Sequence, residues 1–486
     1  MIREIVFLSV PALVEAVLPT VIAEFEATQN VRVQLKMVAW ENYRAEIVNM
    51  ALRQEAVDVA LVGTPVTSDL IGMNILRPFL PTELTSLGGA VAFLPSRWQA
   101  GIRPGETGVW AIPYVVDIRL LYYWRDMLQE AGIDEQTAFQ SLEHIAKTLQ
   151  RLRENGLHSP WDMYDYHFEI LHSASSWIWA SGGDLFSPDG KEVVFNRLQA
   201  LEGVREYFKL LQYVPSERTG VPVELFTQRR TAVAIANAWA FMQDNPADMG
   251  CAPLPGGSYV GGSDLVVWNT THHESAALQF VRFLNQPDVQ SRLIFQTSDM
   301  QPVSQGFQTT NTLPSRMELL NKAVESQGPI RKATLQAALT GRMYPCVPMV
   351  GLVEERLSAE LFLIQKELIS NPQADLDGII RSRFDMLARR INAGLGSIPG
   401  RQFSFVVQPL LLPSKICFAW HSLSQPFVGS RENKVPGNRC SGFLLPLRIY
   451  TREMFCCSKD GQPTFRHCAQ PTRWGRQVSS CRGQRR

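Results

Sequence analysis

Short apolar runs and helical patterns alternate through the first sixty residues, and this order constrains the fold more than any other feature. Residues 5–9 and 58–62 are continuous apolar runs, and residues 31–38 alternate apolar and polar side chains as a half-buried strand does. Residues 12–27 and 42–53 have the period of a helix. The order strand, helix, strand, helix, strand predicts a parallel sheet with right-handed crossovers.

The alternation continues along the chain. Further strands are expected at residues 109–113, 120–124, 232–236 and 265–268, and long helices at residues 141–154, 168–180, 200–211, 275–284, 352–369 and 374–393. No internal repeat with the period of a solenoid or a propeller is present. The sequence therefore predicts an α/β protein.

The composition changes near residue 397. Residues 398–486 contain 14 Lys and Arg against 3 Asp and Glu, whereas residues 1–397 contain 33 against 43. An acidic body argues against nucleic acid as a partner, because phosphate neutralisation needs clustered basic side chains. Six of the 8 cysteines lie in the tail without C-x-x-C spacing, so we expect no metal site and no cofactor. The tail, residues 398–486, is interpreted as a basic, Cys-rich segment that is disordered or non-homologous.

The N-terminal apolar run does not have the features of a cleaved secretion signal. Glu4 and Glu15 bracket it, and no small-residue cleavage site follows. No apolar stretch reaches 18 residues, which argues against a membrane-spanning helix. We therefore expect a chain that begins either like a mature sequence or like a truncated one.

Motifs that would anchor an enzyme are missing from the sequence. It contains no P-loop, no strand-linked G-x-G-x-x-G, no H-E-x-x-H and no G-x-S-x-G. Tryptophans do stand near the predicted ends of strands and helices, at Trp40, Trp179 and Trp239. Aromatic rings pack on the C–H faces of sugars, although core packing is the common role of any single tryptophan. We expect a binding protein and no catalysis.

Six segments, in order, resemble a known family. They are DVALVG at residues 58–63, GVWAIPYVVDIRLLYYWRDMLQEAGID at 108–134, SSWIWASGGDLFSPDG at 175–190, LFTQRRTAVAIANAW at 225–239, APLPGG with YVGGSDLVVW within 252–268, and ESAALQFVRFLNQPDVQSRLIFQTSDMQPVSQ at 274–305. Together they resemble the family 1 extracellular solute-binding proteins of ABC importers, a group that includes maltose-binding proteins. The resemblance covers about residues 4–395, and residues 398–486 lie outside it.

The resemblance implies a two-lobed periplasmic-binding-protein fold of type II with an interlobe cleft and hinge crossings. It implies an N-lobe of residues 1–114 plus 264–313 and a C-lobe of residues 115–263 plus 314–397, with the first crossing at residues 114–119. Ligands of open parallel sheets bind at the carboxyl ends of the strands, which here face the cleft. Binding then favours closure of the lobes, and a membrane permease reads the closed state.

Ten residues are candidates for binding the solute, and they are Trp40, Glu41, Tyr43, Thr64, Tyr114, Asp117, Trp179, Trp239, Gly262 and Ser263. Several have a structural alternative. Glu41 either binds the solute or caps the next helix. Thr64 either donates a hydrogen bond to the solute or stabilises the turn at Pro65. Asp117 either accepts sugar hydroxyls or pairs with Arg119, and Ser263 lies in what is otherwise a plain turn. Trp239 is the preferred stacking residue because the resembling family often carries an aromatic there.

The predicted function is non-enzymatic binding of a mono- or oligosaccharide and its delivery to an ABC permease by a monomer. Three alternatives stay open, namely a polyamine or phosphorylated polyol as solute, a sensory binding protein, and a glycosidase with paired carboxylates. A cationic solute requires carboxylates beside aromatic rings, and an anionic solute requires Arg or helix N-termini. The family implies a periplasmic or extracellular location, whereas the absence of a signal implies a cytoplasmic one if the first residue is the true start.

Overall fold

The computed structural model describes residues 3–10, 17–39, 43–163, 166–216, 223–238, 246–295, 313–325 and 330–396. The chain divides into two units, residues 1–407 and 408–486, and all described residues belong to the first. The basic tail predicted at residues 398–486 therefore lies outside the described residues.

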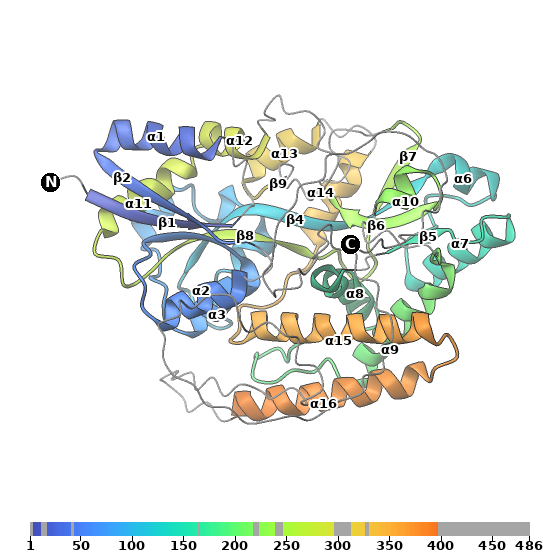
Figure 1. Ribbon diagram of the computed structural model, residues 1–486. Coiled ribbons are helices and arrows are strands. Elements are labelled where there is room, and N and C mark those ends of the chain that lie inside the picture. The colour runs from blue at the N-terminus through green and yellow to red at the C-terminus, as the bar shows by residue number, and fades with distance from the viewer. Residues whose placement is uncertain are drawn as a thin grey trace, which may run out of the picture. The chain divides into compact units, whose positions relative to one another are not determined.

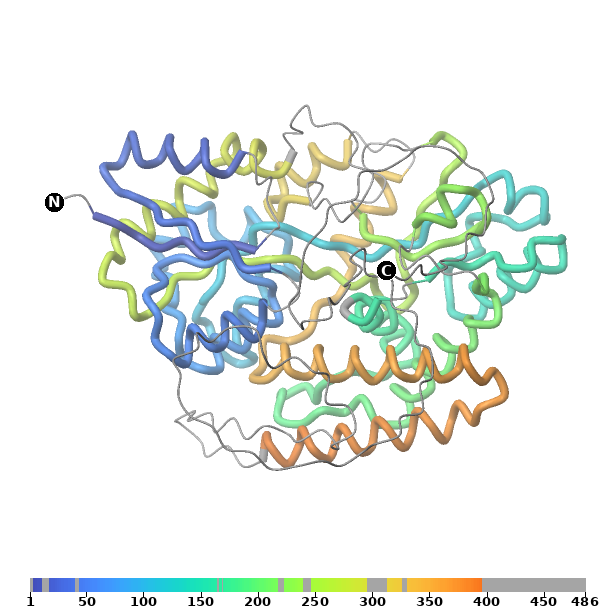
Figure 2. The backbone as a smooth tube through the Cα atoms, in the orientation of Figure 1, coloured from blue at the N-terminus to red at the C-terminus, as the bar shows by residue number. Residues whose placement is uncertain are grey.

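Nine strands form one connected sheet among the described residues (Figures 1 and 2). They are β1 (Arg3–Ser9), β2 (Val31–Met37), β3 (Val59–Gly63), β4 (Ala111–Trp124), β5 (Trp161–Asp162), β6 (Val233–Asn237), β7 (Met249–Pro253), β8 (Val260–Val267) and β9 (Leu313–Pro314). The order is β2-β1-β3-β8-β4-β6-β5, and β7 and β9 also pair with β4. β1 is parallel to β2 and β3, as predicted, whereas β8 is antiparallel to its neighbours β3 and β4.

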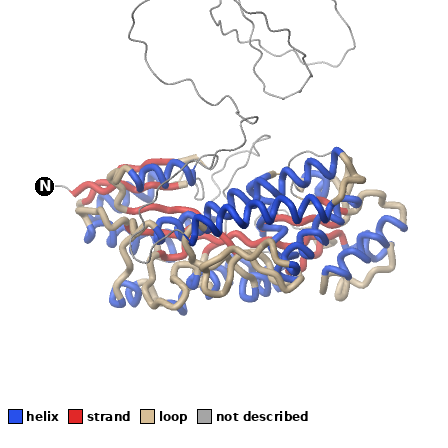
Figure 3. Tube along the Cα trace, turned by 90° about the horizontal axis from the view of Figure 1, so that it is seen from below, coloured by secondary structure: helices blue, strands red, loops and turns tan. Residues whose placement is uncertain are grey.

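Helices lie on both sides of the strands (Figure 3). The α-helices are α1 (Leu18–Gln29), α2 (Tyr43–Leu52), α3 (Thr64–Gly72), α4 (Pro81–Ser86), α5 (Pro95–Gln99), α6 (Arg125–Glu130), α7 (Leu142–Glu154), α8 (His167–Ala180), α9 (Leu198–Lys209), α10 (Glu224–Thr227), α11 (Glu274–Leu284), α12 (Pro287–Phe295), α13 (Met317–Glu325), α14 (Arg331–Thr340), α15 (Val350–Ser370) and α16 (Leu376–Gly396). Two 3₁₀ turns, η1 (Ala90–Ala92) and η2 (Leu210–Tyr213), complete the set. No helix in these ranges is both long and apolar enough to cross a membrane.

β4 is the strand that joins the two ends of the sheet. Its first part pairs with β8 from Ala111 to Ile118, and its second part pairs with β6 and β7 from Arg119 to Trp124. The register against β8 shifts between Pro113 and Val115, as at a β-bulge. The sequence predicts two strands here instead of one, because Asp117 and Arg119 interrupt the apolar run. The structure keeps both in the strand by pairing their charges, with Asp117 Oδ2 2.5 Å from Arg119 Nη1.

The core consists of apolar clusters on the two sides of this strand. One cluster gathers β1, β2, β3, α1, α11 and α12, and Phe280 contacts Phe7 and Phe25 edge-on within it. Another gathers α7, α8, α9, α15 and α16 around Trp161 and Trp177. α15 packs against α16, α8 and α3, so its N-terminal turns reach the strand ends where the candidate site lies (Figure 1).

Candidate functional site

A fully buried guanidinium, that of Arg119, organises the candidate site. Asp117 and Arg119 are two residues apart on β4, so their side chains leave the same face of the sheet. Asp117 is the one position of this strand that is not buried. Arg119 Nη1 donates to Asp117 Oδ2, and Nη2 donates to the Glu169 carboxylate of α8. Two carboxylates thus compensate the charge that the fold removes from water.

His172 extends this arrangement from α8 to α15. It lies one helical turn after Glu169, on the same face of α8. Its Nδ1 is 3.2 Å from Arg119 Nη2, and its Nε2 is 2.6 Å from Glu354 Oε1 on α15. Three elements that are distant in sequence, β4, α8 and α15, therefore meet through one imidazole ring.

Two tyrosines form the wall beside this ring. The Tyr259 ring stacks on His172 with a centroid separation of 4.0 Å and an interplanar angle of 7°. Tyr344 lies 5.1 Å from Tyr259, and its hydroxyl is 3.1 Å from Ser175 Oγ. Burial first, and the charge of Glu354 second, raise the pKa of both phenols well above the ordinary value. Both hydroxyls stay protonated at neutral pH.

These seven residues are called the Arg119 cluster below: Asp117, Arg119, Glu169, His172, Tyr259, Tyr344 and Glu354. Ligand atoms of Asp117, Glu169 and His172 all lie within 4.8 Å of one another, a spacing compatible with a metal ion. Arg119 already donates to Asp117 and Glu169 and approaches His172 Nδ1, so its guanidinium takes the place of a cation. The set fits hydrogen bonding to a solute better than metal coordination.

The first turns of α15 also contact α2 and α3. Arg44 bonds to Asp69 Oδ2 at 2.9 Å and to Glu355 Oε2 at 3.1 Å. The backbone N–H of Gly351 donates to Asp69 Oδ1 at 3.2 Å. Burial raises the pKa of Asp69, and Arg44 partly offsets the effect. This set of contacts, called the Arg44 bridge below, ties α15 to the N-terminal part of the sheet.

Four of the predicted residues gather at the end of β3. The Tyr43 hydroxyl lies against Gly63, where a Cβ would be 2.8 Å away. The Thr64 hydroxyl donates to the Gly262 carbonyl at 3.1 Å, and Ser263 pairs with Gly63 across the sheet. Thr64 and Ser263 are 1% and 3% exposed. Burial, then the charge of Glu354, raises the pKa of Tyr43 well above its ordinary value.

Two predicted residues lie in the core, and three lie outside the described residues. The Tyr114 hydroxyl donates to the Leu284 carbonyl at 2.9 Å, and its ring is fully buried. Trp179 is 5% exposed, and its Nε1 donates to Asp184. Trp40, Glu41 and Trp239 are outside the described ranges. The binding roles of all ten residues stay predictions.

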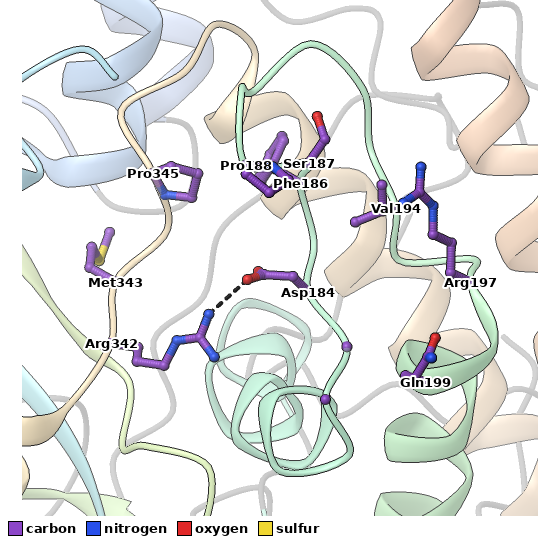
Figure 4. Close-up of a pocket in the computed structure, with 12 residues that line it drawn as sticks. Asp184, Phe186, Ser187, Pro188, Val194, Arg197, Gln199, Arg342, Met343 and Pro345 are labelled. Atoms are coloured by element: carbon purple, nitrogen blue, oxygen red, sulfur yellow. Dashed lines mark hydrogen bonds and ion pairs between the residues drawn. The ribbon is translucent and has the colours of Figure 1, made fainter. Parts of the chain in front are cut away.

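A separate pocket of about 480 Å³ opens at the other end of α8 (Figure 4). Arg342 crosses it and pairs with Asp184 at 2.7 Å, while the same guanidinium lies 4.7 Å from the centre of the Trp179 ring. Phe186 and Pro345 add apolar walls. Arg342 and Asp184 are thus engaged with each other, and Arg197, the third charged side chain of the lining, pairs with Glu192. The pocket therefore offers weaker recognition than the Arg119 cluster.

Sequence reasoning missed Glu169, His172, Tyr259, Tyr344 and Glu354. One signal was available, since Glu169 and His172 are spaced i, i+3 on a predicted helix. His167, the other histidine of this helix, is five residues from His172 and does not share its face. Glu354 gave no signal, because only tertiary packing brings α15 beside α8.

Comparison with known proteins identifies a family and similar folds. Residues 20–319 match the family model described as bacterial extracellular solute-binding protein. The sugar-binding protein MalE from Xanthomonas citri has a similar structure, with a TM-score of 0.65 and 18% identity over 81% of this chain and 98% of that one. Maltose-bound MalE3 from T. maritima has a TM-score of 0.62 and 17% identity over 79% of this chain and 99% of that one. Lmo0181 from Listeria monocytogenes, in complex with cycloalternan, has a TM-score of 0.62 and 15% identity over 80% of this chain and 99% of that one.

These likenesses confirm the predicted two-lobed α/β fold. The family match covers more than half of the chain and includes β4 and β8. It also includes every residue of the Arg119 cluster except Tyr344 and Glu354. The chain belongs to the bacterial extracellular solute-binding protein family.

Proposed function

We propose that this protein binds a carbohydrate without chemical change and delivers it to the permease of an ABC importer, outside the cytoplasmic membrane. The observation that carries the proposal is the Arg119 cluster, which places carboxylates beside tyrosine rings on a fold shared with sugar-binding proteins. Sugar hydroxyls both donate and accept hydrogen bonds, and their C–H faces pack on aromatic rings. Asp117, Glu169 and Glu354 of the cluster offer acceptors for sugar hydroxyls, whereas Tyr259 and Tyr344 are buried beside them.

The lobe boundaries inferred from the sequence belong to this proposal. Residues 114–119 form the first crossing, and the register shift between Pro113 and Val115 lies at its start. A bulge bends a strand and increases its twist, which suits a segment about which two lobes rotate. The protein acts as a monomer, and the permease recognises the closed state.

A glycosidase has less support from the same carboxylates. A retaining or inverting mechanism needs one carboxyl group that carries a proton to donate. Asp117 and Glu169 both accept hydrogen bonds from one guanidinium, an arrangement that suits carboxylates and supplies no acid. Binding without turnover is the simpler use of this geometry.

A cationic solute such as a polyamine is the second candidate, and one observation favours it. The Arg119 cluster has three carboxylates, Asp117, Glu169 and Glu354, against one guanidinium, beside two tyrosines. Ammonium groups bind to carboxylates and to aromatic faces. A phosphorylated polyol fits less well, because Arg119 is already held by two carboxylates.

A thermal-shift series on the full chain tests the proposal. The panel comprises mono- and oligosaccharides, polyamines and glycerol phosphates at matched ionic strength. A solute that binds only the native state raises the melting temperature. At a free concentration one hundred times Kd, it adds about 2.7 kcal/mol to the free energy of unfolding. Stabilisation by a saccharide that is recovered intact supports the proposal. A polyamine as the sole stabiliser would replace the sugar with the second candidate, and formation of a hydrolysis product would contradict binding without turnover.

A further inference from the structure

The imidazole of His172 is held on three sides, so its orientation and protonation follow from its neighbours. Its face stacks on Tyr259 with nearly parallel planes. Nδ1 is directed at Arg119 Nη2 at 3.2 Å, and Nε2 at Glu354 Oε1 at 2.6 Å. Glu169 Oε2 is also near Nδ1, but at the longer distance of 3.5 Å.

The chemistry of the two nearest partners selects one tautomer. A guanidinium has only donors, so His172 Nδ1 must accept from Arg119 and carries no hydrogen. A carboxylate has only acceptors, so Nε2 must carry the hydrogen and donate to Glu354. The two N–H groups of Arg119 Nη2 suffice for both Glu169 and His172. The ring is therefore neutral and protonated on Nε2.

Glu354 keeps one carboxylate oxygen for another donor. Its Oε1 accepts from His172, and within the described ranges Oε2 has no hydrogen-bond partner. Its side chain is 17% exposed, so a solute can reach it. Asp117 differs from Glu354, because Oδ2 accepts from Arg119 and the remaining Oδ1, which has no partner in the described part of the chain, is buried.

We infer that His172 is a positioning residue, which in its Nε2-protonated neutral form fixes Glu354 as a hydrogen-bond acceptor, and that Glu354 determines specificity for solutes offering O–H or N–H donors. The inference rests on the proposed function for the identity of the site. A solute group with acceptors only, such as a phosphate dianion, meets a fixed carboxylate and is rejected. Hydroxyl and ammonium groups are accepted.

The tautomer is measured without any solute, on the full chain at neutral pH. Two-dimensional ¹H–¹⁵N spectra of the imidazole rings distinguish a protonated ring nitrogen from an unprotonated one, and loss of signals in His172→Gln assigns them. The expected result is a protonated Nε2 and an unprotonated Nδ1. A protonated Nδ1 would overturn the inference, whether it belongs to the other neutral tautomer or to an imidazolium that donates to Glu169.

The role of Glu354 is measured by calorimetric titration with maltose. Glu354→Gln and His172→Phe should each weaken binding about tenfold or more, the range for a lost hydrogen bond to a charged group. His172→Phe keeps an aromatic ring against Tyr259, so weaker binding by this variant reports the missing N–H donor. His172→Gln retains an N–H near the Nε2 position and should bind within about threefold of the parent. His144→Gln, at an exposed position of α7, is the matched control and should change nothing.

The outcomes separate this inference from the proposed function. If the parent chain binds maltose and Glu354→Gln binds it equally well, the assignment of Glu354 is wrong although the proposed function stands. If the fold-loss of affinity in the double variant equals the product of the fold-losses in His172→Phe and Glu354→Gln, the two residues act independently. His172 then does not act through Glu354. If the folded parent binds no saccharide at all, the proposed function fails and the assignment of Glu354 fails with it. The tautomer is still decided by the spectra.

Discussion

At the scale of single residues, Arg119 is the group on which the site depends. A guanidinium with no exposed surface is unfavourable unless carboxylates compensate it, and Asp117 and Glu169 do so. The two carboxylates are fixed by the same bonds, which leaves them pre-oriented for a solute. The sequence offered Asp117 with two alternatives, a sugar contact or a pair with Arg119. The pair with Arg119 is present, and the sugar contact stays a prediction.

Gly262 illustrates a residue whose position requires glycine. Its φ is +138°, and a Cβ there would lie 2.0 Å from the Val115 carbonyl oxygen. Gly262→Ala should therefore lower the free energy of unfolding by about 3 kcal/mol or more, measured from the urea midpoint. Gly105→Ala is the matched control, because its φ is +79° but nothing lies within 4 Å of the added methyl. Its loss should be only about 1 kcal/mol. Equal losses for the two would contradict this account.

At the scale of elements, the N-terminal turns of α15 serve two partners. Glu354 faces α8, while Gly351 and Glu355 face the Arg44 bridge. Any movement of α15 is therefore transmitted both to the Arg119 cluster and to α2 and α3. Under the proposed function, this is the link by which a solute bound at the cluster would favour one relative placement of the lobes.

The Arg44 bridge gives a stability prediction with a defined pH dependence. Arg44→Met leaves the buried Asp69 carboxylate without its guanidinium and should cost about 3 kcal/mol near neutral pH. Because the folded-state pKa of Asp69 is raised, its contribution is favourable below the unfolded value and is lost as pH rises through the folded value. Removing Arg44 raises that pKa further. The difference between variant and parent should thus be largest near pH 7 and shrink toward pH 4.5.

Urea midpoints at the two pH values measure this dependence. Adding Asp69→Asn to Arg44→Met removes the buried charge and should restore part of the lost stability, with no remaining dependence on pH. A loss that is the same at both pH values would show that Arg44 stabilises the fold by packing alone.

Element types were largely predictable from the sequence, and the exceptions have physical reasons. β1, β2, α8, α11 and α15 lie within about two residues of their predicted ranges. α3 was missed because Pro65 reads as a turn, whereas proline is also favoured in the first helical turn, where it stands in α3. β4 was divided because two charges stand in its middle. The partners of Arg119 were missed because no local pattern records which helix packs beside which strand.

At the scale of the molecule, the order of strands explains the position of the site. β4 and β8 pair with each other and lie between the N-terminal strands and β6. The Arg119 cluster sits on β4 next to the residue where pairing passes from β8 to β6, and α8 and α15 close over it. The alternating sequence pattern predicted an α/β fold, and the resemblance to solute-binding proteins implied its two lobes. It did not predict which side chains the crossing strands bring together.

Native mass spectrometry of the full chain with an equimolar mixture of mono- and oligosaccharides tests the central claim most directly. Our account predicts a one-to-one complex with a saccharide, which is released with unchanged mass and is weakened by Glu354→Gln. A folded chain that retains no saccharide from the mixture, or that releases a cleaved one, would contradict it.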